Sequence, residues 1–120
     1  MANTFKLKTK ASVGTSLEEY YDVPASKTAI ILSISLSNKT GSAVTADVQV
    51  ISDTSDHSDI ANASANSDVY LIKSAPLPAG STLEIMQGNK LVLQTTDKIK
   101  AMASTGSAVD LIISLMEMDV

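Results

Sequence analysis

The sequence predicts an all-β protein, a two-layer antiparallel β-sandwich of about eight strands, with a jelly roll as one such arrangement. Three observations lead to this fold class. Apolar and polar residues alternate at period two rather than at the helical period. The apolar runs are short, and turn residues separate them at intervals typical of sandwiches. No helical pattern extends beyond one turn at 16–20, where Ser16 and Glu19 have capping-box spacing.

The most regular alternation covers 27–37, where Leu32, Ile34 and Leu36 are expected to share one face and serines the other. A similar alternation marks 43–51. Such patterns are typical of strands with one buried and one solvated face. Further strands are predicted at 68–73, 82–87, 90–95, 97–103 and 108–118. The Gly-Asn pair at 88–89, between two of these runs, predicts a tight hairpin.

The last run, 108–118, is the longest, and both of its faces are rich in apolar residues. One face consists of Val109, Leu111, Ile113 and Leu115. The other contains Ile112, Met116 and Met118, and it is too apolar for a fully solvated surface. Two explanations stay open: a central strand covered on both sides within the chain, or a contact with another subunit. These three residues are therefore interface candidates.

The N-terminal run alternates Phe5 and Leu7 with lysines at positions 6, 8 and 10. Three lysines on one side of a strand are typical of a solvated edge strand that resists aggregation. Phe5 and Leu7 point to the opposite side and are further interface candidates. The segment either extends the sheet of a neighbouring subunit or forms an edge strand or frayed terminus of its own domain.

A chain of 120 residues is expected to form a single domain, 1–120, with a long polar loop at 52–67. Asp53, Asp56 and Asp59 in this loop are candidate cation ligands, because hard cations take several oxygen ligands. The spacing differs from that of an EF-hand, and no glycine provides its sharp turn. A solvated acidic loop is the alternative.

The composition argues against several function classes. The chain has nine lysines and no arginine, and its net charge is −4. Nucleic-acid binding is therefore not expected. No apolar stretch approaches the roughly 18 residues of a membrane helix. The N-terminus lacks the apolar core of a signal peptide, so we expect a soluble protein made in the cytosol. The absence of cysteine excludes disulfides and thiolate metal sites.

No catalytic arrangement is apparent, and the sequence predicts a protein that is not an enzyme and has no cofactor. The one histidine, His57, lies in the polar loop, and no Gly-x-Ser-x-Gly motif accompanies it. Phosphate-binding glycine loops are absent. The acids Glu18, Glu19, Glu84 and Asp97 are scattered, and their spacing alone does not make a catalytic pair.

Two stretches resemble a known class of protein. The first is Tyr21-Asp-Val-Pro24-Ala25, which leads into 27–37 and ends at Asn38. The second contains Tyr70-Leu-Ile-Lys73, a Pro-Ala-Gly corner at 78–80, Leu91-Val-Leu93, Asp97-Lys-Ile-Lys100 and the closing run 108–118. Together they resemble small β-sandwich virion proteins of tailed bacteriophages, especially marine and cyanobacterial phages. The resemblance covers most of the chain, rests on strand and turn patterning, and includes no catalytic signature.

The resemblance implies a structural protein of the virion, made in the host cytoplasm. It implies a capsid decoration or cement subunit, with a neck, tail or baseplate component as the alternative. The implied partners are other virion proteins, such as the major capsid protein, and further copies of the chain. The loop at 52–67 has no counterpart in the resembling pattern. An alternative from another class is a carbohydrate- or receptor-binding module, for which that loop offers the only candidate cation site.

Overall fold

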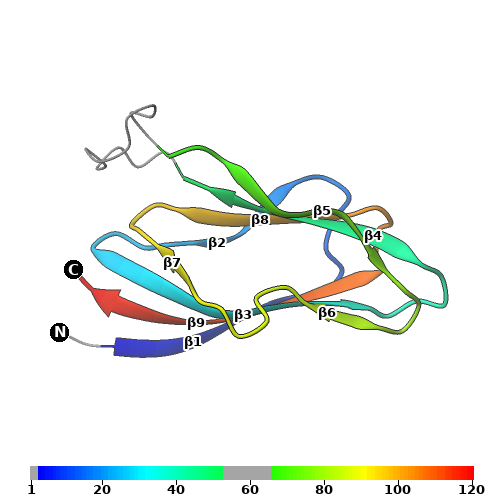
Figure 1. Cartoon of the computed structure of the whole chain (residues 1–120), viewed down its shortest axis with the longest axis horizontal. Helices are drawn as coiled ribbons and strands as arrows, with labels where there is room; N and C mark the ends of the chain where they lie inside the picture. The colour runs from blue at the N-terminus through cyan, green and yellow to red at the C-terminus, as the bar shows by residue number, and fades with distance from the viewer. Residues whose placement is uncertain (1–2, 53–65) are drawn as a thin grey trace.

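The computed structural model describes residues 3–52 and 66–120, which form nine strands and no helix (Figure 1). The strands make two antiparallel sheets that pack face to face. Sheet A contains β1 (Asn3–Lys10), β3 (Lys27–Asn38), β6 (Thr82–Glu84), β7 (Leu91–Leu93) and β9 (Val109–Asp119). Sheet B contains β2 (Glu18–Asp22), β4 (Val44–Ile51), β5 (Val69–Leu77) and β8 (Lys98–Ala103). The described part of the chain contains no helix that could cross a membrane.

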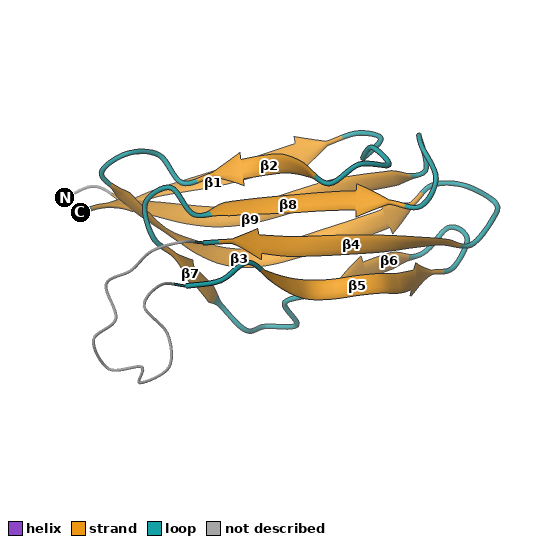
Figure 2. Ribbon diagram, turned by 90° about the horizontal axis from the view of Figure 1, so that it is seen from above, coloured by secondary structure: helices purple, strands orange, loops and turns teal. Residues whose placement is uncertain are grey.

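The strand order is that of a jelly roll with one added strand. Sheet A has the order β1-β9-β3-β6, with β7 also paired to β3, and sheet B has the order β2-β8-β4-β5. The chain crosses between the sheets at most of its connections, as the views from the side and from above show (Figures 1 and 2). The predicted two-layer antiparallel sandwich is confirmed, and jelly-roll connectivity is the arrangement it adopts.

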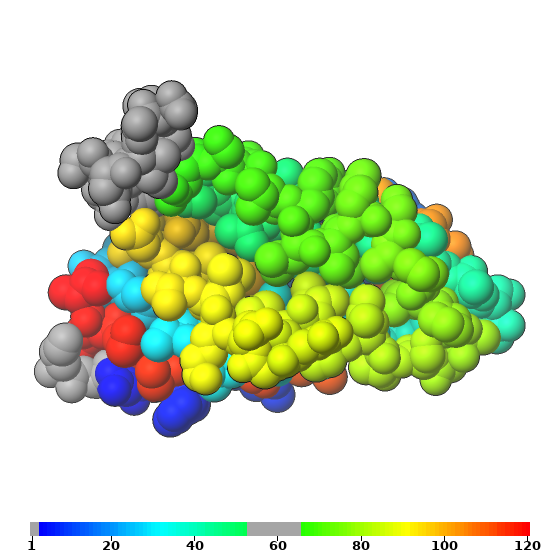
Figure 3. Space-filling model, in the orientation of Figure 1, coloured from blue at the N-terminus to red at the C-terminus, as the bar shows by residue number. Residues whose placement is uncertain are grey.

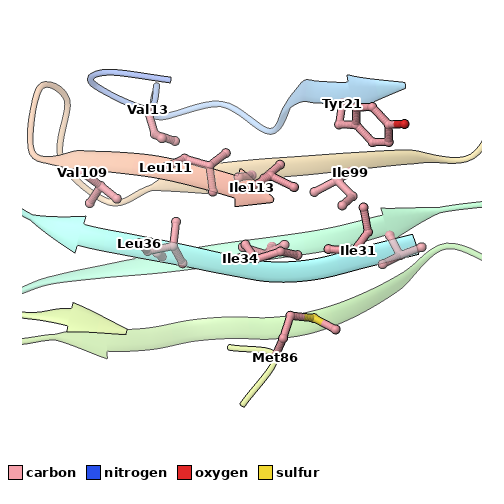
Figure 4. Packing of buried hydrophobic residues seen from close by; sticks show 14 of the residues in the cluster. Val13, Tyr21, Ile31, Ile34, Leu36, Met86, Ile99, Val109, Leu111 and Ile113 are labelled. Atoms are coloured by element: carbon pink, nitrogen blue, oxygen red, sulfur yellow. The ribbon is translucent and has the colours of Figure 1, made fainter. Parts of the chain in front are cut away.

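The core lies between the two sheets. Ile31, Ile34 and Ile113 of sheet A meet Ile99 and Tyr21 of sheet B there (Figure 4). All five are at most 5% exposed. Each fully buried aliphatic side chain contributes roughly 1.5 to 3 kcal/mol to stability. The inward side of β9 is the apolar face predicted at 109–115, so period-two patterning identified the core side of this strand correctly.

A bulge in β3 changes which residues point inward. The pairing of β3 with β9 shifts register between Ile31 and Ser33. Ile34 is buried as expected, but Leu32 is only half-buried, while Ile31 on the other side of the bulge is fully buried. An extra residue in one strand reverses the alternation of faces. The expectation that Leu32 shares a face with Ile34 is therefore wrong.

The predicted hairpin at residues 88–89 is also wrong. β6 and β7 do not pair with each other but both pair with β3, at Ser35–Ser37 and Ala29–Ile31 respectively. β3 has 12 residues, so its edge is long enough for both three-residue strands. Left-handed backbone at Gln87 and Gly88 turns the connection along this edge.

The single helical turn allowed for at 16–20 does not form; β2 begins there at Glu18, which brings the strand count from about eight to nine. β2 pairs with β8 and has a bulge between Glu19 and Tyr21. Tyr21 is thereby buried against the core, and this burial together with the pairing outweighs one capped turn. β5 runs past the predicted 68–73 and includes Pro76, which is tolerated because β5 is the last strand in its sheet.

Candidate functional site

The outer face of sheet A, which points away from sheet B, carries an exposed apolar patch. The register aligns Phe5, Met116, Ile30 and Val92 in one row across β1, β9, β3 and β7. Phe5 is 73% exposed and Val92 is 60% exposed. The adjacent rows of β1, β9 and β3 also contain no charged residue. At the end where β9 finishes (Figure 1), the outer face therefore has one apolar row flanked by rows that are uncharged but partly polar.

All five predicted interface candidates lie on this outer face. They are Phe5, Leu7, Ile112, Met116 and Met118, which alternate with inward-facing residues on β1 and β9. Leu7 is 64% exposed and Ile112 is 40% exposed. β9 is central within sheet A, and its main contacts with described strands are with β3 and β1 of the same sheet. On its outer face Ile112 is exposed, whereas Met116 and Met118 are half-buried.

The N-terminal segment is an edge strand of its own domain. β1 pairs antiparallel with β9 from Asn3 to Lys10. In Figure 3 its atoms, in blue, lie at the margin of the molecule beside those of β9 in red. All eight of its residues are exposed, and its other edge is hydrogen-bonded to no described strand. Sequence patterning missed Ile30 and Val92 as members of the outer face, because the bulge in β3 and the pairing of β7 decide their direction.

A buried carboxylate connects the two sheets. Glu117 of β9 is 2% exposed and accepts a hydrogen bond of 2.7 Å from the Tyr21 hydroxyl of β2. Its other oxygen lies 2.8 Å from Nζ of Lys6 on β1. We call these three residues the Glu117 cluster. Period-two patterning did not single out Glu117, although a signal was present: within the run 108–118 it is the one acid on the side that carries Val109 and Leu111.

The charges in the Glu117 cluster are fixed at neutral pH. Burial acts to raise the pKa of Glu117, but hydrogen bonds from Lys6 and Tyr21 and the charges of Lys6 and Lys8 outweigh burial and lower it. Burial, and then the hydrogen bond to Glu117, raise the pKa of the Tyr21 hydroxyl. A carboxylate held ionised beside a neutral phenol fastens the sheets together and is not poised to exchange protons near pH 7.

The edge strands β1 and β2 lie on the same lateral side of the sandwich, which we call the β1–β2 side (Figure 2). A hollow of about 290 Å³ opens between them, lined by Lys6 and Lys8 of β1, by four consecutive residues of β2, and by Glu117. A second hollow of about 180 Å³ follows along β1. The two sheets are therefore not closed against each other on this side.

Two of the acids weighed as catalytic candidates, Glu84 and Asp97, accept hydrogen bonds from backbone amides. Glu84 accepts hydrogen bonds from the amides of Ile34, Met86 and Gln87 at 2.6 to 2.9 Å. Asp97 accepts one from the amide of Gln94. Glu19 approaches Nζ of Lys98 at 3.9 Å. The backbone contacts give Glu84 and Asp97 a structural role.

The candidate cation ligands Asp53, Asp56 and Asp59 lie outside the described residues, as does His57. The structure therefore does not place the predicted cation loop. Among the residues that it does describe, no group of three or more His, Asp or Glu side chains is arranged to hold a metal ion.

Comparison with known proteins assigns no family to this chain. No family model matches the chain. No curated protein matches it either. One solved structure that it resembles comes from work on Bacillus endospore appendages, described as a novel family of disulfide-linked pili. The sequences are 10% identical, the match covers 99% of this chain and 88% of the other, and the TM-score is 0.48. A likeness at this level carries no argument about function.

Proposed function

We propose that this chain is a non-enzymatic structural subunit that binds a partner protein through the outer face of sheet A. The particle we propose is the virion of a tailed bacteriophage, in which the chain acts as a capsid decoration or cement subunit. The observation that carries the mode of binding is the apolar row from Phe5 to Val92. The choice of particle is supported by the sequence resemblance alone.

The chemistry of the outer face supports a protein partner. Large exposed apolar patches on soluble domains tend to mark interaction sites. Three neighbouring rows on β1, β9 and β3 lack charge, as the centres of protein interfaces usually do. Phe5, at 73% exposure, is an aromatic side chain of the kind enriched at interfaces. A nucleic-acid partner would need basic residues on this face instead.

The construction of the body supports a mechanical role. The buried carboxylates among the described residues, Asp47, Asp97 and Glu117, all make internal contacts. Asp47 accepts hydrogen bonds from the amide of Ser74 and from Lys73, and Glu117 bridges the sheets. A sandwich fixed in this way presents its outer face as a rigid, preformed surface, which reduces the entropy lost on binding.

Copy number in purified virions of the encoding phage tests the placement on the particle. Quantitative mass spectrometry should find a number of copies comparable with the major capsid protein. A copy number that corresponds to only a few rings of subunits would place the protein in the neck, tail or baseplate instead. Absence from the particle would refute the virion assignment.

A binding assay tests the outer face directly. Phe5→Thr/Leu7→Thr should weaken binding to particles lacking this subunit at least about tenfold, because truncating a central anchor commonly costs more than 1 kcal/mol. Val69→Thr/Leu71→Thr is the matched control, since these residues are 53% and 37% exposed on β5 of sheet B. Both variants should fold normally. Wild-type binding by the Phe5/Leu7 variant would exclude the outer face.

A further inference from the structure

The β1–β2 side carries opposite charges on its two edge strands. β1 contains Lys6, Lys8 and Lys10 and no acid. β2 contains Glu18, Glu19 and Asp22 and no base. β1 is an edge strand of sheet A and β2 is an edge strand of sheet B, and the two edges lie on the same lateral side. This side therefore presents a basic strand and an acidic strand, separated by the open hollows between the sheets.

Much of this charge is not neutralised within the described residues. Lys6 pairs with Glu117, and Glu19 makes only the long contact to Lys98. Lys8, Lys10, Glu18 and Asp22 make no ion pair within 4 Å in the described parts of the chain. Lys98 and Lys100 of β8 stand opposite Asp22 and Glu19 in the register, and of these four residues only Lys98 and Glu19 approach within 4 Å. β2 remains the outermost strand of sheet B, with its acids on the open edge.

We propose that a second copy of this chain covers the β1–β2 side, forming a two-fold symmetric dimer in which the basic β1 of each copy faces the acidic β2 of the other. A two-fold axis that lies in the interface parallel to the strands places β1 of each copy beside β2 of the other copy. Each of the two contacts then joins opposite charges, so the surface is complementary to itself. An axis perpendicular to the strands would set lysine against lysine, and is disfavoured.

This dimer uses a different surface from the proposed function. The lysines of β1 point to the inward side of sheet A, whereas Phe5 and Leu7 point to its outer face. A dimer on the β1–β2 side leaves the outer face free for another protein. The failure of either proposal therefore leaves the other standing.

Sedimentation equilibrium of the wild-type protein is the first test. We expect a dimer at low ionic strength whose dissociation constant rises at least tenfold in 1 M salt, because exposed ion pairs are screened. A monomer at low ionic strength up to millimolar protein would overturn the inference. So would a dimer that does not respond to salt and is lost in Phe5→Thr/Leu7→Thr, because it would use the outer face.

Charge reversal then separates contacts between copies from attraction within one copy. Lys8→Glu/Lys10→Glu and Glu19→Lys/Asp22→Lys should each be monomeric, since each sets like charges against each other at both contacts. Mixing the two variants should restore a heterodimer, in which every contact again joins opposite charges. If the wild type dimerises but the folded variants stay monomeric on mixing, the inference fails. If either variant proves unfolded by circular dichroism, the salt dependence of the wild type decides.

Discussion

Replacing Glu117 with glutamine removes one charge from between the sheets while keeping the shape of the side chain. The carboxylate is 2% exposed and accepts from Tyr21 at 2.7 Å and from Lys6 at 2.8 Å. Hydrogen bonds to charged groups contribute about 1.5 to 3 kcal/mol each. The Lys6 side chain is 39% exposed, so solvent screens that pair and the Tyr21 contact carries most of the effect.

We therefore expect Glu117→Gln to lower the free energy of unfolding by about 2 kcal/mol, and Tm by roughly 6 to 10 °C. Circular dichroism during urea and thermal unfolding at neutral pH measures both. Glu18→Gln is the matched control, because Glu18 is an exposed acid on β2 and its change should stay within about 0.5 kcal/mol. Combining Glu117→Gln with Tyr21→Phe in a double-mutant cycle isolates the coupling between the two residues.

The same variant has a predictable pH dependence. The pKa of Glu117 in the folded protein lies below its ordinary value of 4.5. The stabilisation that the carboxylate provides is therefore complete above about pH 4.5, and is lost as the pH falls through the lowered pKa. The stability difference between wild type and Glu117→Gln should shrink in acid. A Glu117→Gln protein as stable as wild type at neutral pH, or a difference unchanged by acid, would refute this reasoning.

Three further predictions follow from burial and pairing. Ile113→Ala should cost about 3 kcal/mol in urea unfolding, whereas Ile112→Ala, one residue away on the outer face, should cost less than about 1 kcal/mol; equal losses would contradict the assigned faces. Asn38→Ala should lower the free energy of unfolding by about 2 kcal/mol, measured by thermal unfolding, because the buried Asn38 amide group donates to the carbonyls of Ser42 and Leu77. A loss under about 0.5 kcal/mol would show that water takes over these two hydrogen bonds. Hydrogen exchange should be faster for amides of β1 than for those at the centre of β9, since β1 is fully exposed and pairs on one edge; equal protection would contradict this.

Local pattern was sufficient for most of the strands. The alternation in 27–37, 43–51 and 108–118 predicted β3, β4 and β9 close to their observed bounds. It succeeded because a pleated strand puts alternate residues on opposite faces wherever it lies in the fold. The strand β2 was missed because only one of its residues, Tyr21, is fully buried and the rest are polar or half-exposed.

The candidate site was only partly predictable. The excess of apolar residues on the second face of β9 was visible in the sequence, and so were Phe5 and Leu7. Whether β1 would lie beside β9, and so join both sets into one surface, was not. That depends on pairing between residues more than 100 positions apart, which local alternation does not encode.

The sequence by itself determined the period of the strands, the core side of the regular strand β9, and the absence of arginine and cysteine. Only the tertiary structure decided where the alternation breaks and which distant residues meet. The bulge after Ile31 reverses faces along β3, and the order of strands puts Glu117 against Tyr21 of the opposite sheet. It also places the lysines of β1 and the acids of β2 on one lateral side. The physical reason is that periodicity is a local property of the backbone, whereas burial and charge pairing arise when distant segments meet.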